Sequence, residues 1–88
     1  MAEIEIFGAP NCGYCQRAKA LLKERSLHYE ERDISDSAQH EELARRLPRV
    51  KSIPQIFING EHIGGFEDLE LMDRRGALLN LTGQGEIT

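Results

Sequence analysis

The sequence of 88 residues lacks the features that mark several classes of protein. It contains no run of basic residues, no aromatic platform and no zinc finger. Its 15 acidic and 11 basic side chains give a net charge of −4, so nucleic-acid binding is not expected. No segment is long and apolar enough to span a bilayer, and the first residues lack the basic and apolar regions of a secretory signal. We therefore expect a cytoplasmic protein with no membrane partner.

Long polar tracts and internal repeats are also missing. With 40% hydrophobic and 30% charged residues, the composition is that of an ordinary globular domain and not of a disordered chain. We expect a single domain over residues 1–88, which buries about 60 to 65% of its unfolded surface. Residues 82–88 carry no periodic signal and two glycines, so we expect this tail to fray.

Cysteine is scarce, because the chain has only Cys12 and Cys15, which lie where a strand pattern gives way to a helical one. As a structural disulfide the pair would close a four-residue loop, which stabilises a fold by only about 2 kcal/mol. Structural zinc would need two more ligands, but His28, His40 and His62 are scattered singly. In a reducing compartment such a pair is more often catalytic or metal-binding, and we interpret it as a redox site.

The two cysteines are expected to have different roles. Cys12 falls where the first turn of a helix begins, so its sulfur faces unpaired backbone N–H groups and the positive end of the helix dipole. Both features favour the thiolate, which is the nucleophile in disulfide exchange. Cys15 lies one turn further along and is expected to be more buried. Cys12 is therefore the candidate nucleophile and Cys15 the candidate resolving cysteine.

Two strands and a helix are expected in the first part of the chain. Residues 3–7 alternate between polar and apolar, which predicts a strand with Ile4 and Ile6 on one face. A weaker, charged strand pattern over residues 27–34 suits the edge of a sheet. Between them, helical spacing over residues 12–25 predicts a helix whose buried positions are Cys15, Ala18, Leu21 and Leu22.

A second helix is expected after residues 35–37, each of which can cap it. Gln39 follows Asp36 by three residues, the spacing of a capping box. The helix should end at Pro48, and its buried stripe is predicted to consist of Leu43, Ala44 and Leu47.

The remaining pattern predicts a hairpin and a third helix. Asn59-Gly60 between apolar runs is a strong type I′ turn signal, so residues 53–58 and 61–65 should form antiparallel strands. A helix is predicted over residues 66–75, and residues 77–81 are expected to add a last turn or a short helix. The order βαβ followed by ββα implies an α/β fold with a four-stranded mixed sheet, the first two strands parallel, and helices on both faces.

Three segments in this order resemble the glutaredoxin family: Cys12-Gly13-Tyr14-Cys15-Gln16-Arg17-Ala18-Lys19, Ser52-Ile53-Pro54-Gln55-Ile56-Phe57 and Ile63-Gly64-Gly65-Phe66-Glu67-Asp68-Leu69. The resemblance covers residues 3–81. It implies a thioredoxin-like fold and a glutathione-dependent thiol-disulfide oxidoreductase, monomeric as an enzyme. The implied partners are glutathione and glutathionylated or disulfide-containing proteins, with ribonucleotide reductase as one candidate.

The resemblance also implies a glutathione-binding site. The family proline that matches Pro54 has a cis peptide bond, which leaves the Ile53 backbone able to pair with glutathione as an added strand. The family amides that match Phe66 and Glu67 hold the γ-glutamyl carboxylate, and Asp68 would meet its ammonium. Asp68 could alternatively cap the helix. Tyr14 matches an aromatic residue beside the glutathionylated sulfur, with a surface tyrosine of no ligand role as the alternative.

Two positions depart from the family pattern. Ala9 stands where many members carry a Lys or Arg for the glycine carboxylate of glutathione. The missing charge could come from a later basic residue, or these residues could form only a solvated face: Arg45, Arg46, Arg49 and Lys51. Gly13 replaces the commoner proline, which makes the turn more flexible and adds an N–H donor.

Two other functions stay open at this point. Family members with Gly or Ser in place of the motif proline sometimes carry a [2Fe-2S] cluster, held between two copies by Cys12 and two glutathione thiols. A related redoxin is recharged by thioredoxin reductase, but that group has an aromatic-rich sequence after the double glycine, which residues 66–69 do not match.

Overall fold

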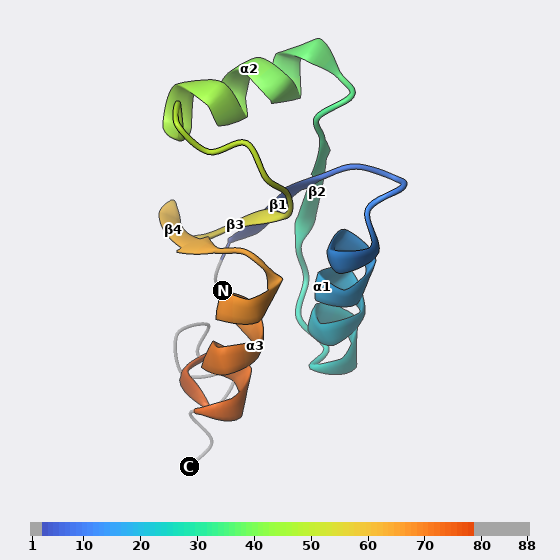
Figure 1. The fold of residues 1–88 in the computed structure, drawn as a ribbon. Coiled ribbons are helices and arrows are strands. Elements are labelled where there is room, and N and C mark those ends of the chain that lie inside the picture. The colour runs from blue at the N-terminus through green and yellow to red at the C-terminus, as the bar shows by residue number, and fades with distance from the viewer. Residues whose placement is uncertain (1–2, 79–88) are drawn as a thin grey trace.

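Four strands form one mixed sheet in the computed structural model, which describes residues 3–78 (Figure 1). The elements in chain order are β1 (Ile4–Gly8), α1 (Gly13–Glu24), β2 (Glu30–Asp33), α2 (Ser37–Arg46), β3 (Gln55–Ile58), β4 (Glu61–Gly64) and α3 (Phe66–Arg74). The strand order is β2-β1-β3-β4, with β1 parallel to β2 and both other pairs antiparallel. The α/β fold and its edge strand β2 are thus confirmed. Residues 77 and 78 are helical, and the rest of the expected last turn lies outside the described residues, as does the tail.

Helices cover both faces of the sheet, as expected. Helices α1 and α3 lie on one side and α2 on the other (Figure 1). Because side chains alternate along a strand, Ile4 and Ile6 pack toward α1 and α3, and Phe7 packs toward α2. The larger core contains Ile4, Ile6, Ala18, Leu22, Leu27, Ile56, Ile58, Leu69 and Leu78. The smaller core contains Phe7, Leu43 and Phe57.

The short helix α2 differs from its prediction in two details. Asp36 is the N-cap and accepts a hydrogen bond from the Ala38 N–H at 2.9 Å. Gln39, however, accepts from Arg32 at 3.0 Å across to strand β2, whereas a capping box would turn it back to the cap. The expected burial of Ala44 is wrong, because this side chain is exposed. The face of α2 toward the sheet is shared between Leu43 and the charged Arg46, which leaves no apolar contact for position 44.

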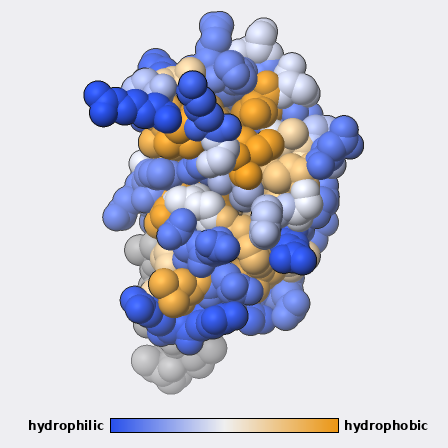
Figure 2. Space-filling model, in the orientation of Figure 1, coloured by the Kyte–Doolittle hydropathy of each residue, from blue (hydrophilic) through white to orange (hydrophobic). Residues whose placement is uncertain are grey.

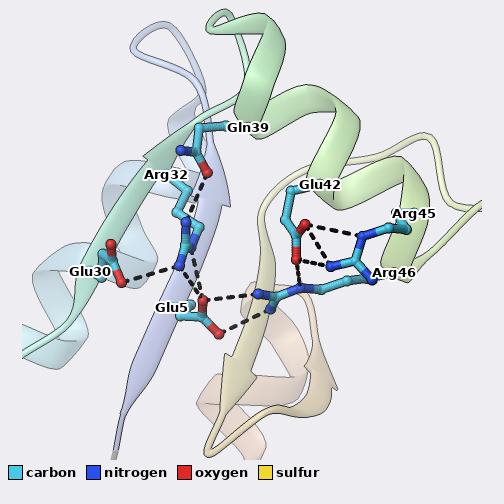
Figure 3. Close-up of polar contacts among 7 residues, drawn as sticks. All are labelled: Glu5, Glu30, Arg32, Gln39, Glu42, Arg45 and Arg46. Carbon is cyan, nitrogen blue, oxygen red and sulfur yellow. Dashed lines mark hydrogen bonds and ion pairs between the residues drawn. The ribbon is translucent and has the colours of Figure 1, made fainter.

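A buried carboxylate, which the strand pattern did not predict, explains the charge on that face. Glu5 lies in the middle of β1 with only 8% of its surface exposed, and it faces α2. Arg32 from β2 and Arg46 from α2 both donate to it (Figure 3). The two guanidinium groups also lie over the ring of Phe7, so the network closes the smaller core.

The hairpin brings strand β4 against helix α3. Asn59 and Gly60 both have positive φ, at 53° and 82°, as a type I′ turn requires, which confirms that prediction. The pairing of β3 with β4 shifts between Ile56 and Phe57, which places one extra residue, Ile63, in β4. Bulges of this kind redirect the chain and occur often beside binding sites. Here Gly64 follows, with φ at +127°, and leads directly into α3.

Candidate functional site

Cys12 is the N-cap of helix α1, where the sequence predicted the nucleophile. Its backbone is extended, and its Sγ accepts a hydrogen bond from the Cys15 N–H at 3.1 Å. The two cysteines are joined as a disulfide, with their Cα atoms 5.1 Å apart. Cys12 is partly exposed, whereas Cys15 is 1% exposed. The expected difference in accessibility is confirmed, and the sulfur of Cys12 lies where a helix N-terminus stabilises a thiolate.

Cys15 packs against Gly8, the last residue of strand β1, which has no side chain. A Cβ atom at position 8 would lie 2.7 Å from Cys15 Sγ and 3.2 Å from its Cβ, both well inside van der Waals contact. Glycine is therefore needed there because Cys15 packs directly against the strand. Gly13 is the opposite case, since a Cβ added to it would meet no atom within 4 Å.

The segment before strand β3 lies against the disulfide from the other side. The Ile53–Pro54 peptide bond is cis, as the family resemblance implied. The carbonyl oxygen of Ile53 is 3.9 Å from Cys12 Sγ. A backbone that is outside the regular sheet pairing therefore lies beside the sulfur of the partly exposed Cys12, where an extended peptide could pair with it.

A groove of about 680 Å³ opens at this place. Figure 2 shows one face of the molecule, mainly hydrophilic, with apolar surface gathered between α2 and the pair α1 and α3. The structure brings all six residues that were predicted to bind glutathione into the lining of the groove: Tyr14, Ile53, Pro54, Phe66, Glu67 and Asp68. These residues come from three separate segments of the chain, so the fold assembles the site.

The acidic end of the groove is the start of helix α3. The backbone N–H of Gly65, the N-cap, donates to Asp68 Oδ2 at 3.0 Å. A side chain on Gly64 would collide with the Asp68 carboxylate, so the double glycine and Asp68 fit together closely. The capping role that was held as an alternative for Asp68 is therefore present. The N–H groups of Phe66 and Glu67 belong to the first turn, which is a favourable place for an anion.

Tyr14 also lines the groove, next to the start of α3. It is 54% exposed, and its ring lies 6.1 Å from the ring of Phe66. The guanidinium of Arg17 lies 5.5 Å from the centre of the Tyr14 ring. The exposed tyrosine is thus held between two helices at the mouth of the groove and does not project freely into solvent.

The candidates for the missing basic residue divide into two pairs. Arg45 and Arg46 form ion pairs with Glu42, and Arg46 also with Glu5, on the α2 side. Arg49 and Lys51 are exposed and line the groove. The structure therefore favours the second pair as the source of positive charge near a ligand.

Among the groove-lining residues that sequence reasoning missed, three are polar, namely Ser52, Gln55 and His62. Gln55 is buried and hydrogen-bonded to the other two. A polar residue inside the apolar pattern of residues 53–58 was the signal that could have identified this cluster.

The fold and the dithiol at a helix N-terminus define a thioredoxin-like redox protein, and comparison with known proteins gives the family. The family model of glutaredoxin matches residues 4–63. Glutaredoxin 3 of Escherichia coli K12 is 44% identical over 79 residues, which cover 89% of this chain and 94% of the relative.

Solved structures agree. The glutaredoxin of Brucella melitensis superposes with a TM-score of 0.78 at 35% identity, covering 100% of this chain and 96% of that one. A buckwheat glutaredoxin-glutathione complex superposes with a TM-score of 0.79 at 28% identity, covering 97% and 81%. The chain belongs to the glutaredoxin family and is a thiol-disulfide oxidoreductase. Among residues 3–78, no helix is long and apolar enough to cross a membrane.

Proposed function

We propose that the Cys12 thiolate reduces glutathione mixed disulfides by a two-step exchange. The thiolate attacks the glutathione sulfur, so that a Cys12–glutathione disulfide forms and the substrate leaves as a thiolate. A second glutathione then attacks the bound one, releases oxidised glutathione and restores Cys12. The partial exposure of Cys12 and the hydrogen bond to its sulfur from the Cys15 N–H support this role.

Cys15 serves the reduction of protein disulfides. When Cys12 is bound to a protein cysteine, the Cys15 thiolate attacks Cys12 Sγ, the protein leaves with two thiols, and the Cys12–Cys15 disulfide forms. Two glutathione molecules then reduce this disulfide and become one oxidised glutathione. The structure holds the two cysteines as this oxidised pair. We place this chemistry in the cytoplasm, where glutathione is kept reduced, and its substrates among glutathionylated or disulfide-containing proteins, with ribonucleotide reductase as one candidate.

Glutathione is proposed to lie along the groove with its cysteine next to Cys12. Its backbone would pair with Ile53, its γ-glutamyl carboxylate would accept from the amides of Phe66 and Glu67, and its ammonium would meet Asp68. The charge distribution of the groove supports this direction, because the acidic residues lie at the α3 end and Arg49 and Lys51 lie in the segment after α2. These two basic residues would attract the glycine carboxylate in place of the residue missing at Ala9.

The observation that carries the proposal is the position of the partly exposed Cys12, whose sulfur is 3.9 Å from the carbonyl oxygen of Ile53, a residue that lines this groove. It is tested by reduction of a glutathionylated peptide with two alternative electron sources, glutathione with glutathione reductase or thioredoxin reductase. Turnover is expected with the first source. Turnover only with thioredoxin reductase would assign the chain to the other redoxin group.

Cluster binding is a second candidate, and the donor set limits how it could occur. Among residues 3–78, no three metal-ligating side chains come together. Cys15 is buried, so each copy can offer Cys12 alone, whereas a [2Fe-2S] cluster takes four ligands. Two copies and two glutathione thiols would supply them. Gly13, beside Cys12, favours this candidate because it is exposed and no atom of the chain would lie within 4 Å of a Cβ added there, so the described chain does not cover this side of Cys12.

A further inference from the structure

Three polar residues of the groove lining are linked by hydrogen bonds beside the Ile53–Pro54 peptide. The Gln55 side chain is buried, with 6% of the residue exposed, and its Nε2 donates to the Ser52 carbonyl oxygen at 3.0 Å. The same nitrogen lies 3.3 Å from Ser52 Oγ. At the other end of the amide, Oε1 is 2.7 Å from His62 Nε2. Strand β4 is thus connected, through Gln55, to the residue that precedes Ile53.

The direction of these hydrogen bonds follows from their chemistry. The Ser52 carbonyl can only accept, so the amide NH₂ of Gln55 faces it and the amide oxygen faces His62. His62 Nε2 must therefore carry hydrogen and donate. His62 satisfies the oxygen of a buried amide, and such an oxygen is costly to leave without a donor.

The linked residues surround the backbone that faces the reactive sulfur. Gln55 reaches back past Pro54 and Ile53 to Ser52, so its side chain closes a loop around the two residues. The Ile53 carbonyl oxygen inside this loop is 3.9 Å from Cys12 Sγ. Loss of the donor at position 62 would let the Gln55 amide rearrange toward another donor, and Ser52 and Ile53 would then lose their fixed position.

We propose that His62 is a positioning residue for glutathione: it holds Gln55, which holds the Ser52–Ile53 backbone opposite Cys12. This rests on the proposed binding of glutathione in the groove. Because His62 acts on the binding surface and not on the sulfur, its loss should change the KM for a glutathione mixed disulfide. The turnover number and the alkylation rate of Cys12 should change little.

Two substitutions separate the hydrogen bond of His62 to Gln55 from the packing of the His62 ring. The centre of this ring lies 5.2 Å from the centre of the Phe57 ring. His62→Phe keeps an aromatic ring but removes the donor, whereas His62→Gln keeps a donor at a similar reach but removes the ring. We expect His62→Phe to raise the KM for a glutathionylated peptide roughly three- to tenfold, the scale of one hydrogen bond. His62→Gln should stay within about twofold of the wild type by the same comparison. His40→Phe, on the exposed side of α2, is the control and should change neither constant.

Equal effects of His62→Phe and His62→Gln, or an unchanged KM in His62→Phe, would overturn the role. A second comparison tests the linkage even if His62→Phe is less stable than the wild type. Gln55→Met and the double variant Gln55→Met/His62→Phe should have the same KM, because Gln55→Met alone already breaks the hydrogen bonds that join His62 to Ser52. Additive effects would refute the linkage.

Failure of the binding site itself is recognised separately in the Cys15→Ser protein. Formation of its glutathione mixed disulfide should shift the amide resonances of Tyr14, Ile53 and Phe66. No shifts in this protein would reject the groove as the glutathione site. Shifts that are the same with and without His62→Phe would reject only the role of His62.

Discussion

Arg46 at the end of α2 donates to both carboxylate oxygens of Glu5, from Nη1 at 3.0 Å and from Nη2 at 3.2 Å (Figure 3). The same guanidinium lies 4.9 Å from the centre of the Phe57 ring and donates from Nε to Glu42 at 2.6 Å. One side chain therefore ties α2 to the central strands β1 and β3. The segment that leaves α2 goes on to form a wall of the groove, so this pair also anchors one end of the groove.

The Glu5 carboxylate gives the stability a defined dependence on pH. The hydrogen bond from Arg46, followed by that from Arg32, holds the pKa of Glu5 below its ordinary value, although burial opposes the shift. A lowered pKa in the folded state stabilises the protein above the unfolded-state pKa near 4.3, and this contribution is lost as the pH falls through the folded-state value. Glu5→Gln should lower the free energy of unfolding at pH 7 by about 1.5 to 3 kcal/mol.

Urea unfolding of the wild type and Glu5→Gln at pH 7 and pH 3 measures this difference. It should shrink at pH 3, which lies below the unfolded-state pKa near 4.3, because part of the stabilisation by the Glu5 carboxylate is lost as the pH falls toward the lowered folded-state value. Glu30→Gln is the matched control. Glu30 also accepts a hydrogen bond from Arg32, but it is exposed and the Nη2–Oε1 distance is long, at 3.4 Å. A difference that is constant between the two pH values would contradict the prediction.

In the reduced protein, Cys12 should react before Cys15. Cys12 is partly exposed at the helix N-terminus, whereas Cys15 lies against Gly8 with 1% of its surface exposed. Limiting iodoacetamide near neutral pH, followed by peptide mass spectrometry, should find the label on Cys12. Preferential labelling of Cys15 would reverse the assigned roles.

Replacing each cysteine should separate the two activities. Cys12→Ser should abolish turnover in every assay, because the nucleophile is gone. Cys15→Ser should keep the reduction of a glutathionylated peptide and lose most of the reduction of a protein disulfide, which needs the second thiol. The two substrates are assayed side by side with glutathione and glutathione reductase, and equal losses in Cys15→Ser would rule out the division of roles.

Gly8→Ala should destabilise the protein by about 1 to 3 kcal/mol, the usual cost of overpacking. The new Cβ would stand 2.7 Å from Cys15 Sγ, and neither the strand nor the start of α1 can move away cheaply. Gly13→Ala is the control, because its Cβ would enter open space. Thermal unfolding of both variants measures the difference, and equal stability would show that the contact relaxes without cost.

The sequence was most informative where the local structure depends on residues that are close together in the chain. The cap at Cys12, the turn at Asn59 and the start of α3 all depend on a few consecutive residues with strong local preferences. Burial of Glu5 depends on an arginine 41 residues away, which no local pattern contains. Ala44 was misplaced for the same reason, because charged side chains took the face that helical spacing assigned to apolar ones.

The candidate site shows the same division. Its six glutathione-binding candidates were identified through motif resemblance, and the structure brings them together at one groove. The contact between Gln55 and His62 depends on the pairing of β3 with β4 and on the extra residue in β4. Register of this kind is a tertiary property, so the linked residues became visible only in the folded chain.

Gly13 is where the two candidate functions separate. It is the first residue of α1, next to the partly exposed Cys12, and nothing lies within 4 Å of a Cβ added there. Proline is well tolerated at the first position of a helix, so Gly13→Pro should fold and keep oxidoreductase activity. It would, however, remove an N–H beside the sulfur and stiffen the turn against a second copy.

Anaerobic reconstitution of the wild type with iron, sulfide and glutathione is therefore expected to give a brown dimer with visible absorption. Gly13→Pro should bind less of the cluster, and Cys12→Ser should bind none because it lacks the protein ligand. Size-exclusion chromatography with absorption detection measures both properties together. A colourless monomer in the presence of glutathione would eliminate the cluster function and leave disulfide reduction as the activity of this site.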